Sequence, residues 1–498
     1  MRIQRLLTSG LAVLVFAGWT PGPGMAAPTE ATTDNAPAAV GAAGIGDAVW
    51  PEEGNGGYDV LDQRLAFRFA TDLSKYTAST ALSARATQDL DRFDLDLLGP
   101  KVERVRVNGR LAAWASTSEG ELVITPASRI HNGAHFVVEV SVTNTVPVAA
   151  TPADLPASGL FRSAGWIQSI NQPAAARRML AVSDHPAQKA PATFVITAPS
   201  SLNSIANGKL LRTVRLGGLT TRVFREDRRI ATELMQIGVG PFTVVRRRGP
   251  HGLELRYAVP TARLAEIEPQ LDAFDASVRF MESRLGRFPG DRAGALITPY
   301  GGELETQGLT LLKADLMTKK GFEQESGATI VLHEVSHEWF GNSVSPKRWS
   351  DVWLNEGHAT FYHQEWIATH GGGPQVDVTR STYEELGNKL LKNGPIALPD
   401  PATFPGPVAS FRPYSNAAYL GGALVLFALE QQVGKATFTK IERAWVSEHA
   451  NGVGGTDDFI STASRVGGSD LAPFLRSWLY GTSLPRMPGH PDWRPAAA

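Results

Sequence analysis

The chain has 498 residues, of which 43% are hydrophobic and 19% charged, and it contains no cysteine. This is the composition of a globular protein with room for two or three domains, and it excludes a chain that is disordered throughout. Lys and Arg number 48 against 49 Asp and Glu, so no global field draws the protein to nucleic acid or to an anionic membrane. Without cysteine, a metal site must use histidine and carboxylate ligands.

The N-terminus has the pattern of an export signal. Arg2 and Arg5 precede an apolar run over 6–19, and the small residues Gly24 and Ala26 suit a signal peptidase. We therefore expect 1–26 to be a cleaved signal peptide and the mature protein to be exported and soluble, in the periplasm or outside the cell. The alternative is an uncleaved membrane anchor, which the short and interrupted run disfavours.

The remainder of the chain reads as a leader and two domains. Residues 27–57 are rich in Ala, Gly, Thr and Pro without hydrophobic periodicity, which predicts a flexible leader. Residues 58–250 contain short alternating runs such as "KVERVRVNG" and "HFVVEVSVTN", which predict a β-rich domain. Within 251–498 the apolar spacing becomes helical, and the longest apolar run, 417–429, has the length of a buried helix and not of a membrane span. The predicted fold class is α+β.

The stretch "GATIVLHEVSHEWFGN", 327–342, contains a candidate metal site. His333 and His337 lie one helical turn apart, so both imidazoles project from one face and can share an ion. Two histidines inside an ordinary helical core would give the same short pattern. A third ligand is required, because catalytic zinc takes three protein ligands and keeps a fourth position open.

The segment "SDVWLNEGHATFYH" supplies that third ligand. Glu356 lies nineteen residues after His337, which is enough for the chain to turn and return on a second helix. Its neighbours are apolar, so the carboxylate is expected near buried surface, where it needs a partner. The alternative is a carboxylate that only caps or charges a surface helix.

Together these motifs resemble the gluzincin zinc aminopeptidases, metallopeptidase family M-one, to which alanyl aminopeptidase and leukotriene hydrolase belong. "HEVSHEWFGN" is followed by "WLNEGHAT", and further matches run along the mature chain: "YDVLDQRLAF", "QPAAARRMLAVSDHPAQKAPATF", "YGGELETQGLTLL" and "PYSNAAYLGGALVLFALEQ". The resemblance implies a saddle-like N-terminal β domain followed by a thermolysin-like catalytic domain, with one zinc ion per chain in the cleft between them.

The resemblance also implies roles for individual residues. The implied zinc ligands are His333, His337 and Glu356. Glu334 would be the general base that takes a proton from the attacking water, and Tyr419 would donate a hydrogen bond to the developing oxyanion. Tyr414 competes for the second role. We interpret His358 as a supporting residue and not as a fourth ligand.

Recognition of a free terminal amine calls for a further carboxylate. The loop that begins at Gly302 matches the family's exopeptidase loop and contains Glu305 as the matching carboxylate. Gln172 matches a family position that assists from the β domain. The predicted substrate-binding residues are therefore Gly302, Glu305 and Gln172. Glu303 competes with Glu305, because an extra residue precedes the matching glutamate. The loop departs from the family's usual Met and Asn at two positions, Leu304 and Thr306.

The predicted function is zinc-dependent removal of N-terminal residues from peptides with a free N-terminus. One alternative is a zinc hydrolase of the same fold with another substrate, such as a glycyl-type aminopeptidase or an epoxide hydrolase. The other is a non-catalytic peptide-binding scaffold. The helical cap domain of larger relatives is not expected after the catalytic domain, which would leave the cleft more open. The sequence does not indicate an oligomeric state.

Overall fold

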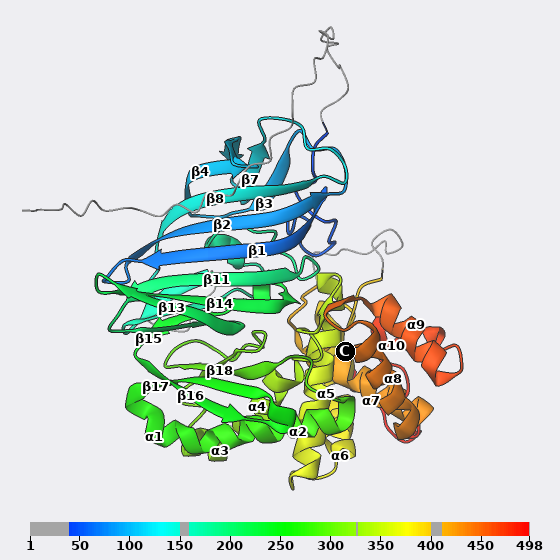
Figure 1. The fold of residues 1–498 in the computed structure, drawn as a ribbon. Helices are drawn as coiled ribbons and strands as arrows, with labels where there is room; N and C mark the ends of the chain where they lie inside the picture. The colour runs from blue at the N-terminus through cyan, green and yellow to red at the C-terminus, as the bar shows by residue number, and fades with distance from the viewer. Residues whose placement is uncertain (1–38, 150–158, 325–326, 400–410, 498) are drawn as a thin grey trace, which may run out of the picture. The chain divides into compact units, whose positions relative to one another are not determined.

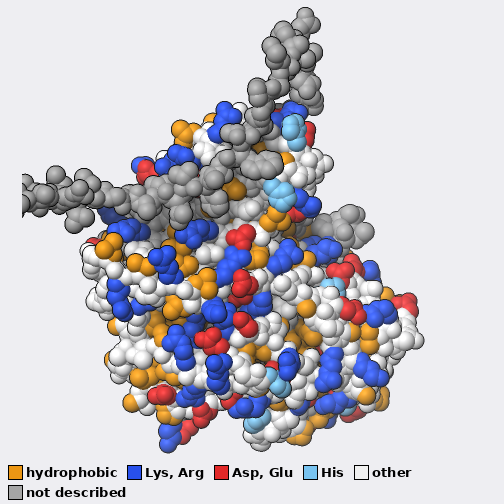
Figure 2. Space-filling model, viewed as in Figure 1, with side chains coloured by type: hydrophobic (Ala, Val, Ile, Leu, Met, Phe, Trp, Pro, Cys, Tyr) orange, Lys and Arg blue, Asp and Glu red, His pale blue; other side chains and the backbone are white. Residues whose placement is uncertain are grey.

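The computed structural model describes four stretches of the chain: 39–149, 159–324, 327–399 and 411–497. The predicted signal peptide lies outside these residues. Residues Ala38–Ala498 form one compact unit. Among the described helices, none is both long and apolar enough to cross a bilayer. Figure 2 shows basic and acidic side chains interspersed over one face of the molecule, in keeping with the net charge of -1.

The largest sheet has eight strands in the order β13-β14-β11-β1-β2-β8-β4-β5. Its strands are β1 (Tyr58–Phe69), β2 (Lys75–Ala86), β4 (Lys101–Val107), β5 (Arg110–Leu111), β8 (His135–Thr145), β11 (Ala190–Pro199), β13 (Lys209–Leu216) and β14 (Leu219–Ile230). β1 and β11 run parallel, and β1 pairs antiparallel with β2. Buried and exposed residues alternate along β2 and β8, so one face of the sheet packs on a core and the other meets solvent.

Two smaller sheets complete the N-terminal β region. One contains β3 (Phe93–Asp96), β7 (Glu121–Thr125) and β6 (Ala113–Ser116), and the other contains β12 (Asn203–Ala206), β15 (Ile237–Gly240), β10 (Trp166–Ile170) and β9 (Gly159–Ser163). The end of β10 leads directly to Gln172. The Nε2 of Gln168, within β10, donates to the carbonyl of Tyr300 at 2.7 Å, which ties this sheet to the loop that follows β18.

A four-stranded sheet begins the second region and corrects the predicted domain boundary. Its strands are β16 (Phe242–Arg248), β17 (Glu254–Pro260), β18 (Arg292–Thr298) and β19 (Thr310–Lys313), in chain order. A boundary after residue 250 would separate β16 from the strand with which it pairs. The β-branched residues of β16 favour a strand, as do those of the preceding strands, so composition alone could not assign it to the second sheet.

Helices form most of the second region (Figure 1). They are α1 (Leu264–Ile267), α2 (Asp272–Leu285), α3 (Lys319–Gln324), α4 (Gly327–Ser336), α5 (Trp353–Thr369), α6 (Gln375–Ser381), α7 (Gly422–Val433), α8 (Lys435–Glu448), α9 (Thr456–Gly467) and α10 (Ala472–Leu479). A short parallel pair, β20 (Val344–Pro346) and β21 (Gly452–Gly454), lies among them. Helix α5 contacts both α4 and α7, with most of its length buried. The fold is α+β, as predicted.

The predicted flexible leader is wrong for residues 39–57. The Asp47 carboxylate accepts a hydrogen bond from the backbone N–H of Trp349 at 2.7 Å, and the Glu53 carboxylate accepts one from the Trp349 indole, also at 2.7 Å. The side chain of Asn55 is fully buried. Asp47 and Glu53 bind a partner about 300 positions away in the chain, which composition could not reveal.

Glu53 gives the stability of the fold a pH dependence. Burial and the nearby Asp184 carboxylate raise the pKa of Glu53 from 4.5 to about 8, against the opposing effects of Arg177 and Trp349. Between these values the folded state holds a proton that the unfolded state releases, so the contribution of Glu53 to stability falls as pH rises from 4.5 to 8.

Glu53→Gln removes this titration and retains an oxygen that can accept from Trp349. We expect the free energy of unfolding to exceed that of the unmodified protein by on the order of 5 kcal/mol at pH 8.5, with the difference vanishing toward pH 4.5. Thermal unfolding midpoints at pH 5 and pH 8.5 measure it. The exposed neighbour Glu52→Gln is the control, and an equal difference at both pH values would contradict the prediction.

Candidate metal centre

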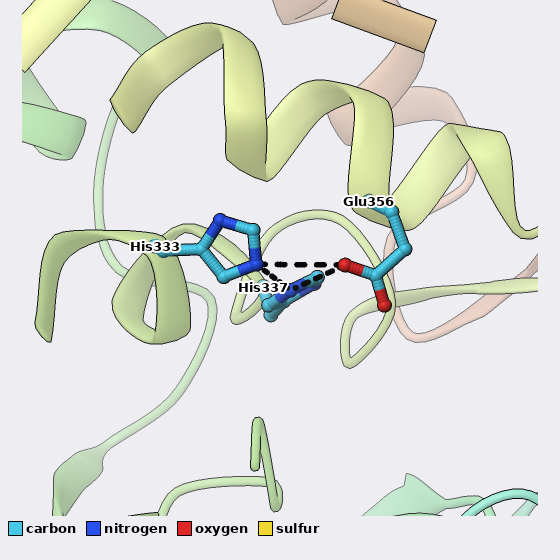
Figure 3. A group of neighbouring side chains, drawn as sticks. All are labelled: His333, His337 and Glu356. Carbon is cyan, nitrogen blue, oxygen red and sulfur yellow. Dashed lines mark hydrogen bonds and ion pairs between the residues drawn. The ribbon is translucent and has the colours of Figure 1, made fainter. Parts of the chain in front are cut away.

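Two segments bring three potential ligands together. His333 lies in α4, and His337 lies one residue beyond the end of that helix, with the two Nε2 atoms 3.3 Å apart. Glu356 comes from the first turn of α5. Its Oε2 is 3.5 Å from the Nε2 of each histidine (Figure 3). The three atoms therefore form a nearly equilateral triangle.

This triangle fits a zinc ion. Ligand atoms at about 2.0–2.2 Å from a tetrahedral zinc lie about 3.3–3.6 Å from one another, which matches the observed separations. The Oε2 atom of Glu356 is buried and has no hydrogen-bond partner among the described residues. A buried carboxylate oxygen without a donor is costly unless a cation binds it. The donor set also agrees with a chain that lacks cysteine.

Hydrogen bonding orients His337 for this role. Its Nδ1 lies 3.0 Å from the carbonyl oxygen of Phe340. Because a carbonyl can only accept, Nδ1 carries the hydrogen, and Nε2 is the atom available to a metal. Burial opposes a charge on His337, but the carboxylates of Glu305 and Glu356 outweigh it and raise the His337 pKa to about 10. The surroundings of Nε2 thus favour a positive charge.

The carboxylate of Glu356 is held in its ionised form. Burial alone would raise its pKa, but His337 and His333 outweigh burial and lower the Glu356 pKa to about 2. The neighbouring His363 behaves in the opposite way: burial, and after it the adjacent His333, lower the His363 pKa to about 4. His363 is therefore neutral near pH 7 and adds no positive charge to the site.

Glu334 lies between the two histidines in sequence and faces the same space. It is buried, and its Oε2 has no hydrogen-bond partner in the described structure. Burial raises the Glu334 pKa well above its ordinary value; His337 lowers it, and Glu305 and Glu356 add to the increase. A carboxylate in such surroundings takes up a proton readily, as a general base must.

A glycine contact brings Tyr419 beside Glu356. A Cβ placed on Gly357 of α5 would lie 2.8 Å from the Cα of Gly422 in α7, so only glycines allow the two helices to approach this closely. Tyr419 lies in a short π-helix, Ala417–Gly421, that leads directly into α7. Its ring stacks on that of His333 with centroids 6.1 Å apart. Burial, and then the Glu356 carboxylate, raise the pKa of Tyr419, so its phenol stays protonated.

Glu305 approaches the same group from the loop before β19. Ligating atoms of Glu305, Glu334 and His337 all lie within 4.8 Å of one another. The Nε2 of Gln172 donates to Oε1 of Glu305 at 2.6 Å, across the contact between the β domain and the helical region. The residues predicted from distant motifs thus meet at one place.

A cavity of about 510 Å³ opens on the metal centre. Its lining includes all of the site residues predicted from the sequence except Gly302. A Cβ on Gly302 would meet no atom within 4 Å, so this glycine faces open space. Glu303 lines the cavity together with Glu305, whereas Tyr414 is not among the lining residues and packs against Trp349, with ring centroids 6.1 Å apart.

His358 points away from the metal centre. Its Nδ1 donates to the Leu354 carbonyl at 2.7 Å, and its Nε2 lies 3.3 Å from the carboxylate of the fully buried Glu442. Both ring nitrogens therefore have partners outside the metal group. The histidine joins α5 to α8 and supports the helix that carries Glu356.

Residues 299–478 match the Peptidase family M1 domain. The matched stretch contains the three potential metal ligands and Glu334. The chain is 25% identical to an M1 zinc metallopeptidase from Deinococcus radiodurans, whose crystal structure matches with a TM-score of 0.76 over 89% of this chain and 99% of that one.

Two relatives of the chain are named aminopeptidases. The chain is 24% identical over 423 residues to the leucyl aminopeptidase of Saccharolobus solfataricus. This alignment covers 81% of this chain and 50% of the archaeal protein. The chain is 25% identical over 316 residues to aminopeptidase M1 of Arabidopsis thaliana. This alignment covers 62% of this chain and 36% of the plant protein. The chain therefore spans half or less of the length of these relatives.

The cavity also contains residues that the sequence analysis missed. Thr360 and His363 follow Glu356 by four and seven positions on α5, and Ile330 precedes His333 by three on α4. These spacings place each residue on the same helix face as the ligand beside it. Helical periodicity could therefore have found them. Asn416 and Leu420 flank Tyr419 and carry no comparable signal.

Proposed function

We propose that the protein is a zinc aminopeptidase that removes N-terminal residues from peptides. The observation that carries the proposal is the position of the Glu305 carboxylate, within 4.8 Å of ligating atoms of Glu334 and His337. A second carboxylate beside a metal centre suits recognition of an ammonium group close to the bond that is cut. The aminopeptidase names of the relatives support the same activity.

In this proposal His333, His337 and Glu356 hold one zinc ion. Zinc supplies a Lewis acid that polarises the scissile carbonyl and lowers the pKa of water from about 15.7 toward about 7. Glu334 accepts the proton of the attacking water and can return it to the leaving amine, because its buried carboxylate favours the protonated form. An intact base is not needed for binding alone, which disfavours a scaffold.

Tyr419 is proposed to donate a hydrogen bond to the oxyanion. We expect Tyr419→Phe to lower kcat by about 10² to 10³-fold with little change in KM, because the oxyanion exists only in the transition state. Tyr414→Phe is the matched control and should retain kcat within a few-fold, since Tyr414 is not among the cavity-lining residues. Steady-state kinetics on an aminoacyl anilide decide between them. If the two variants responded in the reverse way, Tyr414 would take the role.

Glu305 is proposed to bind the substrate ammonium. The test compares aminoacyl anilides with their N-acetylated forms, using protein with one zinc per chain. We expect Glu305→Ala to lose at least about tenfold of the discrimination between them, the equivalent of one charge-assisted hydrogen bond. Unchanged discrimination would remove Glu305 from the amine site and leave Glu303 as the candidate. Failure of the unmodified enzyme to cleave any free-amine substrate would overturn the aminopeptidase assignment itself.

We also propose that the protein is exported after cleavage of residues 1–26, a proposal supported by the basic and then apolar N-terminal sequence. N-terminal sequencing of the mature protein from its native cells tests it. A mature chain that begins at Met1 would contradict it.

A further inference from the structure

Glu305 lies in a loop that has little regular structure of its own, yet the residue is held at three points. Its side chain accepts from Gln172 Nε2 at 2.6 Å. Its own carbonyl accepts from Asn342 Nδ2 at 2.7 Å. The residue before it, Leu304, exchanges two backbone hydrogen bonds with Leu311, at 3.0 and 2.9 Å.

Asn342 is itself held from the β domain. It is 1% exposed, and its backbone carbonyl accepts from Lys189 Nζ at 2.8 Å. Lys189 directly precedes β11, and its ammonium also donates to the carbonyls of Ser343 and Gly452, both at 3.1 Å. The lysine is 1% exposed, and burial with the nearby Arg228 and Arg229 lowers its pKa to about 7. Three carbonyls around one buried ammonium offset the cost of removing it from water.

We propose that Lys189 and Asn342 are positioning residues that set the place of Glu305 and thereby the selectivity for a free N-terminus; this rests on the proposed aminopeptidase function. Lys189 orders the 342–343 backbone, Asn342 fixes the Glu305 carbonyl, and Gln172 fixes the carboxylate. Two of the three residues come from the β domain. The amine site is therefore built on the contact between the β domain and the helical region, while the metal ligands come from α4, the residue directly after it, and α5.

The separation between the two sites makes the inference testable. Loss of the Asn342 side chain or of the Lys189 charge should disturb recognition of the ammonium and leave the three metal-group residues in place. An ammonium contact formed in both the ground state and the transition state contributes mainly to KM. A general weakening of the fold would instead lower zinc content and kcat together.

The experiment uses the full-length, zinc-loaded enzyme and the variants Asn342→Ala, Lys189→Met and their double mutant. We expect each single variant to raise KM for an aminoacyl anilide by about tenfold, the effect of one lost buried hydrogen bond, with kcat within about threefold. The preference for the free amine over its N-acetylated form should fall by a similar factor. The double mutant should lose little more than Asn342→Ala, because both residues act through the same backbone.

Ser345→Ala is the matched control. Its hydroxyl is fully buried in the same segment and donates to the Gly341 carbonyl at 2.6 Å, without touching Glu305. It should retain the KM and selectivity of the unmodified enzyme. If Asn342→Ala does not fold, Asn342→Asp keeps the size of the side chain and removes the donor.

Two results would overturn the inference. The first is that the unmodified enzyme prefers the free amine and both variants keep the same preference. This result would leave the proposed function intact. The second is that the variants lose zinc, or lose turnover equally on the free-amine and the N-acetylated substrate. Either outcome would mean that Lys189 and Asn342 stabilise the fold and do not position Glu305. Absence of free-amine preference in the unmodified enzyme would instead count against the proposed function.

Discussion

Replacing Glu334 by Gln is expected to leave zinc bound and to lower kcat/KM by about 10² to 10⁴-fold, the usual contribution of a general base. The amide keeps the size of the side chain but cannot accept a proton from water. Because Glu334 is not part of the His333, His337 and Glu356 triangle, the affinity for zinc should change little. Zinc content per chain, measured beside turnover of an aminoacyl anilide, separates the two effects.

Glu338→Gln is the matched control for this variant. Glu338 is fully buried one helical turn after Glu334, and burial raises its pKa to about 7, but it is not among the cavity-lining residues. It accepts a hydrogen bond from the Gly308 N–H, which the glutamine oxygen can also accept. Turnover within a few-fold of the unmodified enzyme is expected. Loss of zinc from Glu334→Gln would mean that the glutamate is a ligand and not the base.

Replacing Glu356 by Gln is expected to have the largest effect on metal binding. The carboxylate is the only acidic member of the ligand triangle and is held ionised, with a pKa of about 2. An amide oxygen carries no net charge, so the loss in zinc affinity should exceed the roughly 10 to 100-fold that residues supporting a ligand contribute. Turnover should fall in proportion to bound zinc and recover in part when zinc is added in excess.

Competition with a chelator of known affinity measures this loss. Glu365→Gln serves as the control, since Glu365 lies on the same helix and instead forms ion pairs with Arg284 and Lys435. Its zinc affinity should equal that of the unmodified protein. Retention of full zinc affinity by Glu356→Gln would exclude Glu356 as a ligand and would remove the basis of the zinc assignment.

The local parts of the site could be predicted from the sequence. The four-residue spacing of His333 and His337 places the two side chains one helical turn apart on the same face, and Glu334 must lie next to His333. This follows because helical geometry is set by hydrogen bonds between near neighbours. The alternation of apolar residues in 58–145 likewise predicted strands, and the structure has β1, β2 and β8 there. The α+β class followed from these two periodicities.

Other features follow from contacts that no local pattern contains. The composition of 39–57 suggests a free leader, yet Asp47 and Glu53 are buried against Trp349. The strand β16 has the texture of the β domain but pairs in the sheet of the helical region. In both cases the partner lies in a different part of the chain, and side-chain chemistry alone does not identify it.

By itself, the sequence determined the two imidazoles, the adjacent base and the absence of thiolate ligands. Only the tertiary structure decided that Glu356 converges on the histidines, that Tyr419 and not Tyr414 faces the cavity, and that Gln172 meets Glu305. The close approach of Gly357 to Gly422 brings Tyr419 beside Glu356, and the Lys189 ammonium holds the backbone at the domain contact. The physical reason is that a helical repeat depends on residues that are neighbours in the sequence. The packing of two helices or two domains depends instead on surface shapes that form only when the chain has folded.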